Sequence, residues 1–511
     1  MSLSLFAIFM PITPTPISGG GSSSQTTACS GNDPKVQEEI ERTLQIANSS
    51  PNSAQAIAYQ ISRVMSDPSL TQQQKDEYIA ALLGMANGDA NGCRSVSPEQ
   101  AEAINRAFNE IGNTFSGENT PELRQQVTDS IARNVSAGRL GADELYGLVR
   151  EPGTAGARQL LTGIEDGKIL ADVSKRLLAD ARREGYDINK YQNGPALLTA
   201  AADIANLAAG HGDTSAANDV LGEIDTVMKQ GPVAGDMTLV QAMMATSCGG
   251  LVHLPARDGF HALAALLNSS SSNATNQEAQ DRLFAALARS GNDGYAGGID
   301  QSGERTSALE QLGKYFEQNF SRLAEADWRK TNTGDFHHGL IKDFMRYVLL
   351  DTDYKRVDQT NHVIATEMRH LVDRIGNDNL PQDARETAAS TLGSIMGSLE
   401  WATADFIEHA HGDADAKVQL IRLFSDKLTS ALISAGPGKV PGGSEVSNHL
   451  VDEIWENIAN RMASGEVERG EGVTNDMIEL SRIFRDAMSN GDTSLLTAFD
   501  LREDLYYDPD E

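Results

Sequence analysis

The sequence predicts an all-α protein: an irregular helical solenoid or multi-helix bundle built from antiparallel helix pairs, preceded by a disordered N-terminal tail. Aromatic residues make up only 5% of the 511 residues, which favours helix packing over sheets. Apolar residues recur with the helical period, and no comparable run alternates with the period of a strand. A Gly-Asp pair also recurs between helix-like stretches, at Gly88-Asp89, Gly212-Asp213, Gly235-Asp236, Gly334-Asp335, Gly412-Asp413 and Gly491-Asp492.

These Gly-Asp pairs have a simple structural explanation. Glycine just past a helix end adopts the left-handed conformation at little cost, and aspartate then caps the next helix. The residue before the pair varies, with His211 and His411 in two copies and Asn87 and Asn490 in two others. A helix C-terminus tolerates this exchange but a fixed metal site does not, so the repeated turn indicates architecture rather than chemistry.

The helices themselves are predicted from the spacing of apolar residues. The first begins at Pro34 and places Val36, Ile40 and Leu44 on one face. A stretch in the second half of the chain matches the amphipathic template at every position, with Ile341, Phe344, Met345, Val348 and Leu349.

The N-terminal residues 1–34 are predicted to be a disordered tail. Residues 11–34 consist almost entirely of Pro, Gly, Ser and Thr, and such a stretch cannot bury enough apolar area to offset its ordering entropy. In composition it resembles the uncharged, Ser/Thr-rich N-termini of bacterial effectors exported by type III secretion. The resemblance implies synthesis in the cytoplasm and export by a specialised secretion system. An ordinary flexible terminus is the alternative.

Two polar segments of small residues divide the rest of the chain. Residues 268–276 and 434–444 are rich in Ser, Asn, Gly and Pro, and both are predicted to be non-helical linkers. They delimit helical domains at 35–267 and 277–433 and a C-terminal helical segment with an acidic tail at 445–511.

Internal similarity is present but irregular. Leu70-Thr71-Gln72 precedes a helix predicted to end near Gly84, and Leu380-Pro381-Gln382 precedes a helix predicted to end near Gly393. The spacing between such matches is unlike the fixed period of tetratricopeptide or ankyrin arrays. An irregular stack of helices is the architecture that this pattern favours.

The net charge of −30 argues against nucleic acid as a partner, because affinity for phosphates rests on Lys and Arg. It is compatible with simple solubility or with a basic protein partner. No segment reaches the roughly 18 uninterrupted apolar residues of a membrane-spanning helix. The three cysteines form no Cys-x-x-Cys pair, so neither a disulfide framework nor a zinc site is predicted, and no cofactor is expected.

Histidine placement raises the question of a metal site. Seven of the ten histidines lie within 337–449, and the pairs Glu367/His370 and Glu408/His411 have the Glu-x-x-His spacing of di-metal carboxylate bundles. However, Glu367 falls at the edge of the apolar stripe of its helix, His370 lies outside it, and Glu408 points nearly opposite to the buried side. Since bundle ligands must project inward, the predicted geometry counts against these four metal candidates.

The C-terminal residues 500–511 carry six acidic residues and two adjacent tyrosines. Acidic segments that include aromatics can dock on basic grooves, which makes Tyr506, Tyr507 and Asp508 candidate partner-binding residues. A solvated tail is the alternative.

Two function classes follow. The first is a non-enzymatic helical interaction or scaffold protein with a protein partner, for which a bacterial secreted effector is one form. The second is a metal-dependent enzyme that uses the His-rich residues 337–411. The zincin, nucleophile-elbow and EF-hand motifs do not occur in the sequence, so catalytic residues stay unassigned.

Overall fold

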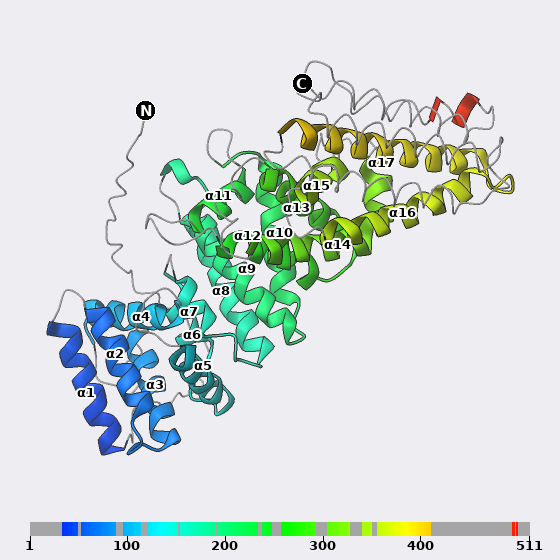
Figure 1. Ribbon diagram of the computed structural model, residues 1–511. Helices are drawn as coiled ribbons and strands as arrows, with labels where there is room; N and C mark the ends of the chain where they lie inside the picture. The colour runs from blue at the N-terminus through cyan, green and yellow to red at the C-terminus, as the bar shows by residue number, and fades with distance from the viewer. Residues whose placement is uncertain are drawn as a thin grey trace. The chain divides into compact units, whose positions relative to one another are not determined.

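The computed structural model describes thirteen stretches of the chain and confirms the all-α class. These are residues 33–49, 53–87, 96–113, 121–151, 154–190, 193–233, 238–247, 257–292, 304–327, 340–349, 355–409, 493–495 and 497–498. Within them every regular element is a helix (Figure 1). The chain divides into two compact units, Met1–Ser272 (unit 1) and Asn273–Glu511 (unit 2).

Unit 1 contains most of the described helices. They are α1 (Pro34–Ser49), α2 (Ser53–Ser66), α3 (Gln72–Ala86), α4 (Pro98–Gly112), α5 (Pro121–Ser136), α6 (Ala142–Val149), α7 (Ala155–Gln159), α8 (Gly167–Glu184), the short 3-10 helix η1 (Ile188–Lys190), α9 (Gly194–Gly210), α10 (Ser215–Gln230), α11 (Leu239–Ser247) and α12 (Arg257–Ser269). Unit 2 contains α13 (Ala274–Asn292), α14 (Glu304–Asp327), α15 (Leu340–Leu349), α16 (Lys355–Ile375) and α17 (Gln382–His409).

Helices that are close in the chain are also close in space. Every extensive helix–helix contact among the described elements joins partners at most three helices apart, for example α8 with α9, α2 with α4 and α15 with α17. This locality is typical of stacked helical pairs, in which each element is covered by its neighbours along the chain. The described helices of each unit therefore pack mainly on their neighbours along the chain, as in a helical bundle or solenoid.

The amphipathic faces predicted from the sequence are buried. Val36, Ile40 and Leu44 lie in the core of unit 1, as do Ile341, Phe344, Met345 and Val348 in unit 2. In unit 2 the rings of Phe284, Phe316 and Phe344 from three successive helices converge, with centroids 4.4–6.2 Å apart. A chain poor in aromatics thus concentrates several of them in one core.

Glycine in the left-handed conformation follows or closely follows four of the described helices. Gly138, Gly185, Gly212 and Gly231 have φ between 69° and 103°, after α5, α8, α9 and α10 respectively. At the Gly212-Asp213 pair the predicted glycine turn is confirmed, but the N-cap of α10 is Thr214 and not Asp213. The Asp213 N–H donates to the Ala208 carbonyl, and the Asp213 carboxylate accepts from the Ser215 N–H at the start of α10. The other five Gly-Asp pairs lie outside the described residues.

Replacement of Gly212 by alanine is expected to lower the free energy of unfolding by about 1 kcal/mol, because its φ of 89° is strained for any residue with a Cβ atom. The matched control is Gly210→Ala, two residues earlier on α9. A Cβ atom at either position meets nothing within 4 Å, and only Gly212 has a positive φ. Urea unfolding should therefore show a loss for Gly212→Ala and no loss for Gly210→Ala, and equal losses would contradict this account.

Two expectations about helix boundaries are wrong. The helix after Leu380-Pro381 does not end near Gly393 but continues to His409, because both flanks of Gly393 are buried against other helices and packing offsets the cost of glycine. The segment 268–276 is also not wholly non-helical, since α12 reaches Ser269 and α13 begins at Ala274. The boundary between the two units falls inside this segment, between Ser272 and Asn273.

Several predicted parts lie outside the described residues. They are residues 1–32 of the N-terminal tail, the linker 434–444 and nearly all of the segment 445–511. The helix that follows the tail begins at Pro34, as predicted. The three-domain division stays a prediction.

Candidate functional site

A polar groove in unit 1 lies where the α9–α10 turn meets the start of α8. Its volume is about 730 Å³, and it is wide open to solvent. One wall comes from residues 165–168 and the other from residues 211–215 and Asn218. The two walls approach closely because position 167 is glycine: a Cβ atom there would lie 3.1 Å from the Ala208 carbonyl oxygen.

The acidic groups of the groove are already used by the backbone around them. Asp166 caps α8 by accepting hydrogen bonds from the N–H groups of Lys168 (3.0 Å) and Ile169 (3.2 Å). Asp213 accepts from the N–H (3.0 Å) and the hydroxyl (2.6 Å) of Ser215. These two hydrogen bonds, followed by the charges of Lys175 and Lys168, hold the pKa of Asp213 below its usual range. Asp166 is therefore the N-cap of α8, while Asp213 binds the first N–H of α10 from the residue before the cap, Thr214.

Histidine, aspartate and serine occur together at this turn without forming a catalytic triad. In a triad the serine hydroxyl donates to histidine, and histidine donates to aspartate. Here the Ser215 hydroxyl donates directly to Asp213, so the nucleophile and the base are not connected through His211. The groove can accept a polar group or segment, and the hydrogen bonds described above do not activate a nucleophile.

The Glu367/His370 pair is positioned as the helical period predicts. Both residues lie on α16, where Met368 and Leu371 are buried. The Glu367 side chain is 13% exposed and accepts a hydrogen bond from Ser321 of α14 (2.9 Å), whereas the His370 side chain is 63% exposed. The distance between His370 Nδ1 and Glu367 Oε1 is 3.8 Å. Glu367 thus joins two helices while the imidazole faces solvent.

No further ligand completes that pair. Among the described residues there is no group of three or more His, Cys, Asp and Glu side chains that could hold a metal ion. The side chain of Glu408, at the end of α17, and all of His411 lie outside the described residues, as do Tyr506, Tyr507 and Asp508. The structure therefore does not bring the four metal candidates together in the part of the chain that it describes.

Buried ion pairs are the charged features that sequence reasoning missed. In unit 1, the side chain of Asp76 of α3 is only 6% exposed. It accepts hydrogen bonds from both Nε and Nη2 of Arg133 of α5, each at 2.9 Å. In unit 2, the buried Asp281 of α13 accepts from Tyr315 of α14 (2.8 Å) and pairs with Arg322. Burial and the Asp281 charge raise the pKa of Tyr315. These groups join neighbouring helices.

Comparisons of the chain with protein-family models, with curated proteins and with solved structures gave no match. In the described part of the chain, none of the helices has the length and apolar character needed to cross a bilayer.

Proposed function

We propose that this chain is a non-enzymatic interaction protein that presents the outer faces of stacked helices to another protein. The observation that carries the proposal is the locality of the helix contacts in each unit, where partners are at most three helices apart. Proteins built in this way display extended surfaces on which other proteins bind.

The use of charge inside the units supports the same function. The buried acids Asp76 and Asp281 are each neutralised by an arginine from another helix. Glu39 of α1 accepts a hydrogen bond from Gln60 (2.8 Å) and forms an ion pair with Arg63, and both of these residues belong to α2. Buried charge in these places joins helices. The outer faces are left for recognition.

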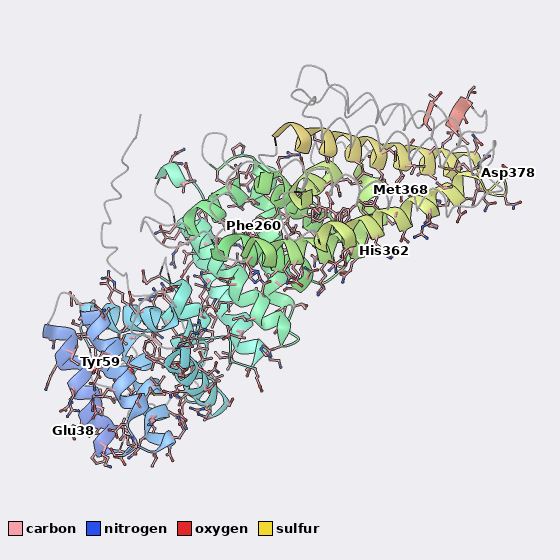
Figure 2. All side chains as sticks on the ribbon, in the orientation of Figure 1. Glu38, Tyr59, Phe260, His362, Met368 and Asp378 are labelled. Carbon is pink, nitrogen blue, oxygen red and sulfur yellow. The ribbon has the colours of Figure 1, made fainter. Side chains whose placement is uncertain are left out.

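Tyr59 on α2 offers a point of contact for a partner. Its side chain is 68% exposed, and it is the one large hydrophobic residue exposed to that degree in the described part of the chain (Figure 2). Tyrosine is enriched at protein interfaces because it combines apolar area with a hydroxyl group.

A photo-crosslinking amino acid in place of Tyr59 tests the interaction function. The full chain carrying this residue is irradiated in lysate of its source cells, and the same residue in place of the exposed Lys229 of α10 serves as the control. We expect a discrete protein adduct at position 59 and none at position 229. No adduct at position 59, or the same adducts at both positions, would contradict the proposal.

We further propose, from the composition of residues 11–34, that the N-terminal tail directs export through a type III system. Fusion of residues 1–34 to a reporter enzyme should give secretion in a strain with an intact secretion ATPase and none in a strain without it. Secretion in both strains, or in neither, would reject this part of the proposal without touching the interaction function.

A further inference from the structure

Two helical hairpins in different units share a set of hydrogen bonds at equivalent positions. They are α2–α3 in unit 1 and α16–α17 in unit 2. In the turns, the Leu70 N–H donates to the Asp67 carbonyl and the Leu380 N–H to the Asn377 carbonyl, at 3.4 and 3.0 Å. The Ser69 N–H likewise donates to Asp67 Oδ1 and the Asn379 N–H to Asn377 Oδ1, at 2.7 and 3.1 Å.

The correspondence extends to the long side chains after the turn. Lys75 Nζ donates to the Met65 carbonyl at 2.7 Å, and Arg385 Nε donates to the Ile375 carbonyl at 2.8 Å. Gln72 Nε2 donates to Asp76 Oδ1 at 3.0 Å, and Gln382 Nε2 donates to Glu386 Oε1 at 3.2 Å. These four bonds of the first hairpin therefore each have a counterpart at the same position of the second, whereas the Thr71–Gln74 capping box has none, because the equivalent residue is Pro381.

Along the matched part of the second helix of each hairpin, burial differs at one place. From residue 71 to 86 and from 381 to 396, equivalent positions have the same degree of exposure, except that Asp76 is buried and Glu386 is partly exposed. The difference is informative because both positions carry a carboxylate that accepts from the glutamine one turn earlier.

Asp76 is buried because a helix docks on it. In unit 1, Arg133 of α5 donates two hydrogen bonds to the Asp76 carboxylate. The Ser130 hydroxyl also donates to Asp76 Oδ1 (2.7 Å), and the Asn134 side-chain amide donates to the Asp76 backbone carbonyl (2.8 Å). The carboxylate is thus the point at which an arginine-bearing helix is held against α3. A bidentate arginine–carboxylate pair fixes orientation as well as contributing energy.

Glu386 has no such cover within the described residues. Gln382 is the one hydrogen-bond donor that the structure shows for its carboxylate. Ser494 and Ala498 lie near it, since Ser494 accepts from Gln382 and the Ala498 carbonyl accepts from Ser390. The nearby Asp378, at the turn between α16 and α17, is labelled in Figure 2 and pairs with Arg385 at 3.5 Å, so the charge of Arg385 is directed to the turn and not to Glu386.

We propose that the face of α17 around Glu386 is a docking site for an arginine-bearing helix of a protein partner, held as α5 is held on α3. This inference rests on the proposed interaction function and specifies one site for it. The partner helix carries an arginine and a small polar residue one turn apart, as Arg133 and Ser130 do. Its arginine neutralises Glu386, and its small residue lies beside Gln382.

A peptide with the sequence of residues 121–140 is the probe for this site. Isolated helices of this length are marginal, so the peptide carries Gln125→Lys, and the lysine amine is joined to the Asp129 carboxylate as a lactam with loss of water. These two positions are neighbours on α5 of the full chain, where Gln125 hydrogen-bonds Asp129 at 2.7 Å. Fluorescence anisotropy with the full chain should show saturable binding. Glu386→Lys in the chain, or Arg133→Glu in the peptide, should each weaken binding about tenfold, and the two changes together should restore part of it.

The matched control is Glu77→Lys on α3. Glu77 is also partly exposed and also accepts from the glutamine one turn earlier, Gln73 (2.9 Å), so the charge change and the local contact are the same. Absence of saturable binding, an equal loss with Glu77→Lys, or no recovery in the double charge reversal would overturn the proposal.

One further outcome would also overturn it. Ile483-Phe484-Arg485-Asp486, outside the described residues, resembles Ile131-Ala132-Arg133-Asn134 of α5 in sequence. If Arg485→Glu raises the affinity of the full chain for the peptide, the chain's own arginine competes for Glu386 and the site is internal. The adduct at position 59 tests the interaction function independently, so failure at Glu386 alone rejects only this docking site.

Discussion

Gly156→Ala is expected to lower the free energy of unfolding of unit 1 by about 3 kcal/mol, because α4 and α7 pack backbone against backbone at this residue. A Cβ atom on Gly156 would lie 2.1 Å from the Asn109 carbonyl oxygen, and one on Gly112 would lie 1.7 Å from the Gly156 carbonyl oxygen. Neither neighbour is the end of a flexible side chain, so the helices must move apart. The Asn109 side chain, which accepts from the Ala157 N–H (3.1 Å), would lose its position as well.

Gly84→Ala is the control for this prediction. Gly84 is buried within α3, yet a Cβ atom there meets nothing within 4 Å. Alanine should raise the free energy of unfolding by about 0.5–1 kcal/mol, because it restricts the unfolded chain and favours the helix. Urea unfolding of the three variants Gly156→Ala, Gly112→Ala and Gly84→Ala would measure both signs. Similar stability in all three would contradict the backbone contact between α4 and α7 at Gly112 and Gly156.

Arg133→Ala should cost about 3 kcal/mol of stability, since it leaves the Asp76 carboxylate buried without its cation. Ser130 and Gln72 would remain as hydrogen-bond donors, which limits the loss but does not neutralise the charge. Arg133→Lys should recover part of the stability, because an ammonium group supplies charge but not the bidentate geometry. Thermal and urea unfolding of Arg133→Ala, Arg133→Lys and the native chain provide the measurement. Equal stability of all three would contradict a stabilising role of the Arg133–Asp76 ion pair.

The same pair predicts an acid-sensitive contribution to stability. Burial of the Asp76 carboxyl opposes its ionisation, but the hydrogen bonds from Arg133, Ser130 and Gln72 outweigh burial, and its pKa lies below the usual range. A carboxyl whose folded pKa is depressed stabilises the fold at pH values above its unfolded pKa of about 3.9. That stabilisation is lost as the pH falls through the folded pKa. The difference in stability between the native chain and Arg133→Ala should therefore be constant near neutrality and shrink below about pH 4.

Periodic features of the sequence were sufficient to predict the fold class. The apolar stripe of α16 correctly placed His370 in solvent and Glu367 at the edge, because a helical wheel needs only local sequence. Glycine was a weaker guide. It marked the end of α9 at Gly212, but Gly393 lies inside α17, where tertiary packing outweighs propensity.

The contact between α3 and α5 could not be predicted in this way. Asp76 and Arg133 are 57 residues apart, and neither belongs to a motif that would connect them. The similarity of Leu70-Thr71-Gln72 to Leu380-Pro381-Gln382 did point to equivalent hairpins. Only the side-chain hydrogen bonds of Lys75 and Arg385 show how far the equivalence extends, because these residues differ in type but reach the same carbonyl position.

The short-range contacts within unit 1 also determine how it should unfold. When each helix is held by neighbours close in the chain, bringing partners together closes only short loops, so ordered segments can form early and grow by addition. The same locality means that a terminal helix can detach without breaking the interior. Among the described helices of unit 1, amide hydrogen exchange should therefore be fastest in α1, whose described neighbours all follow it in the chain, and slowest in α8 and α9, which have described neighbours on both sides.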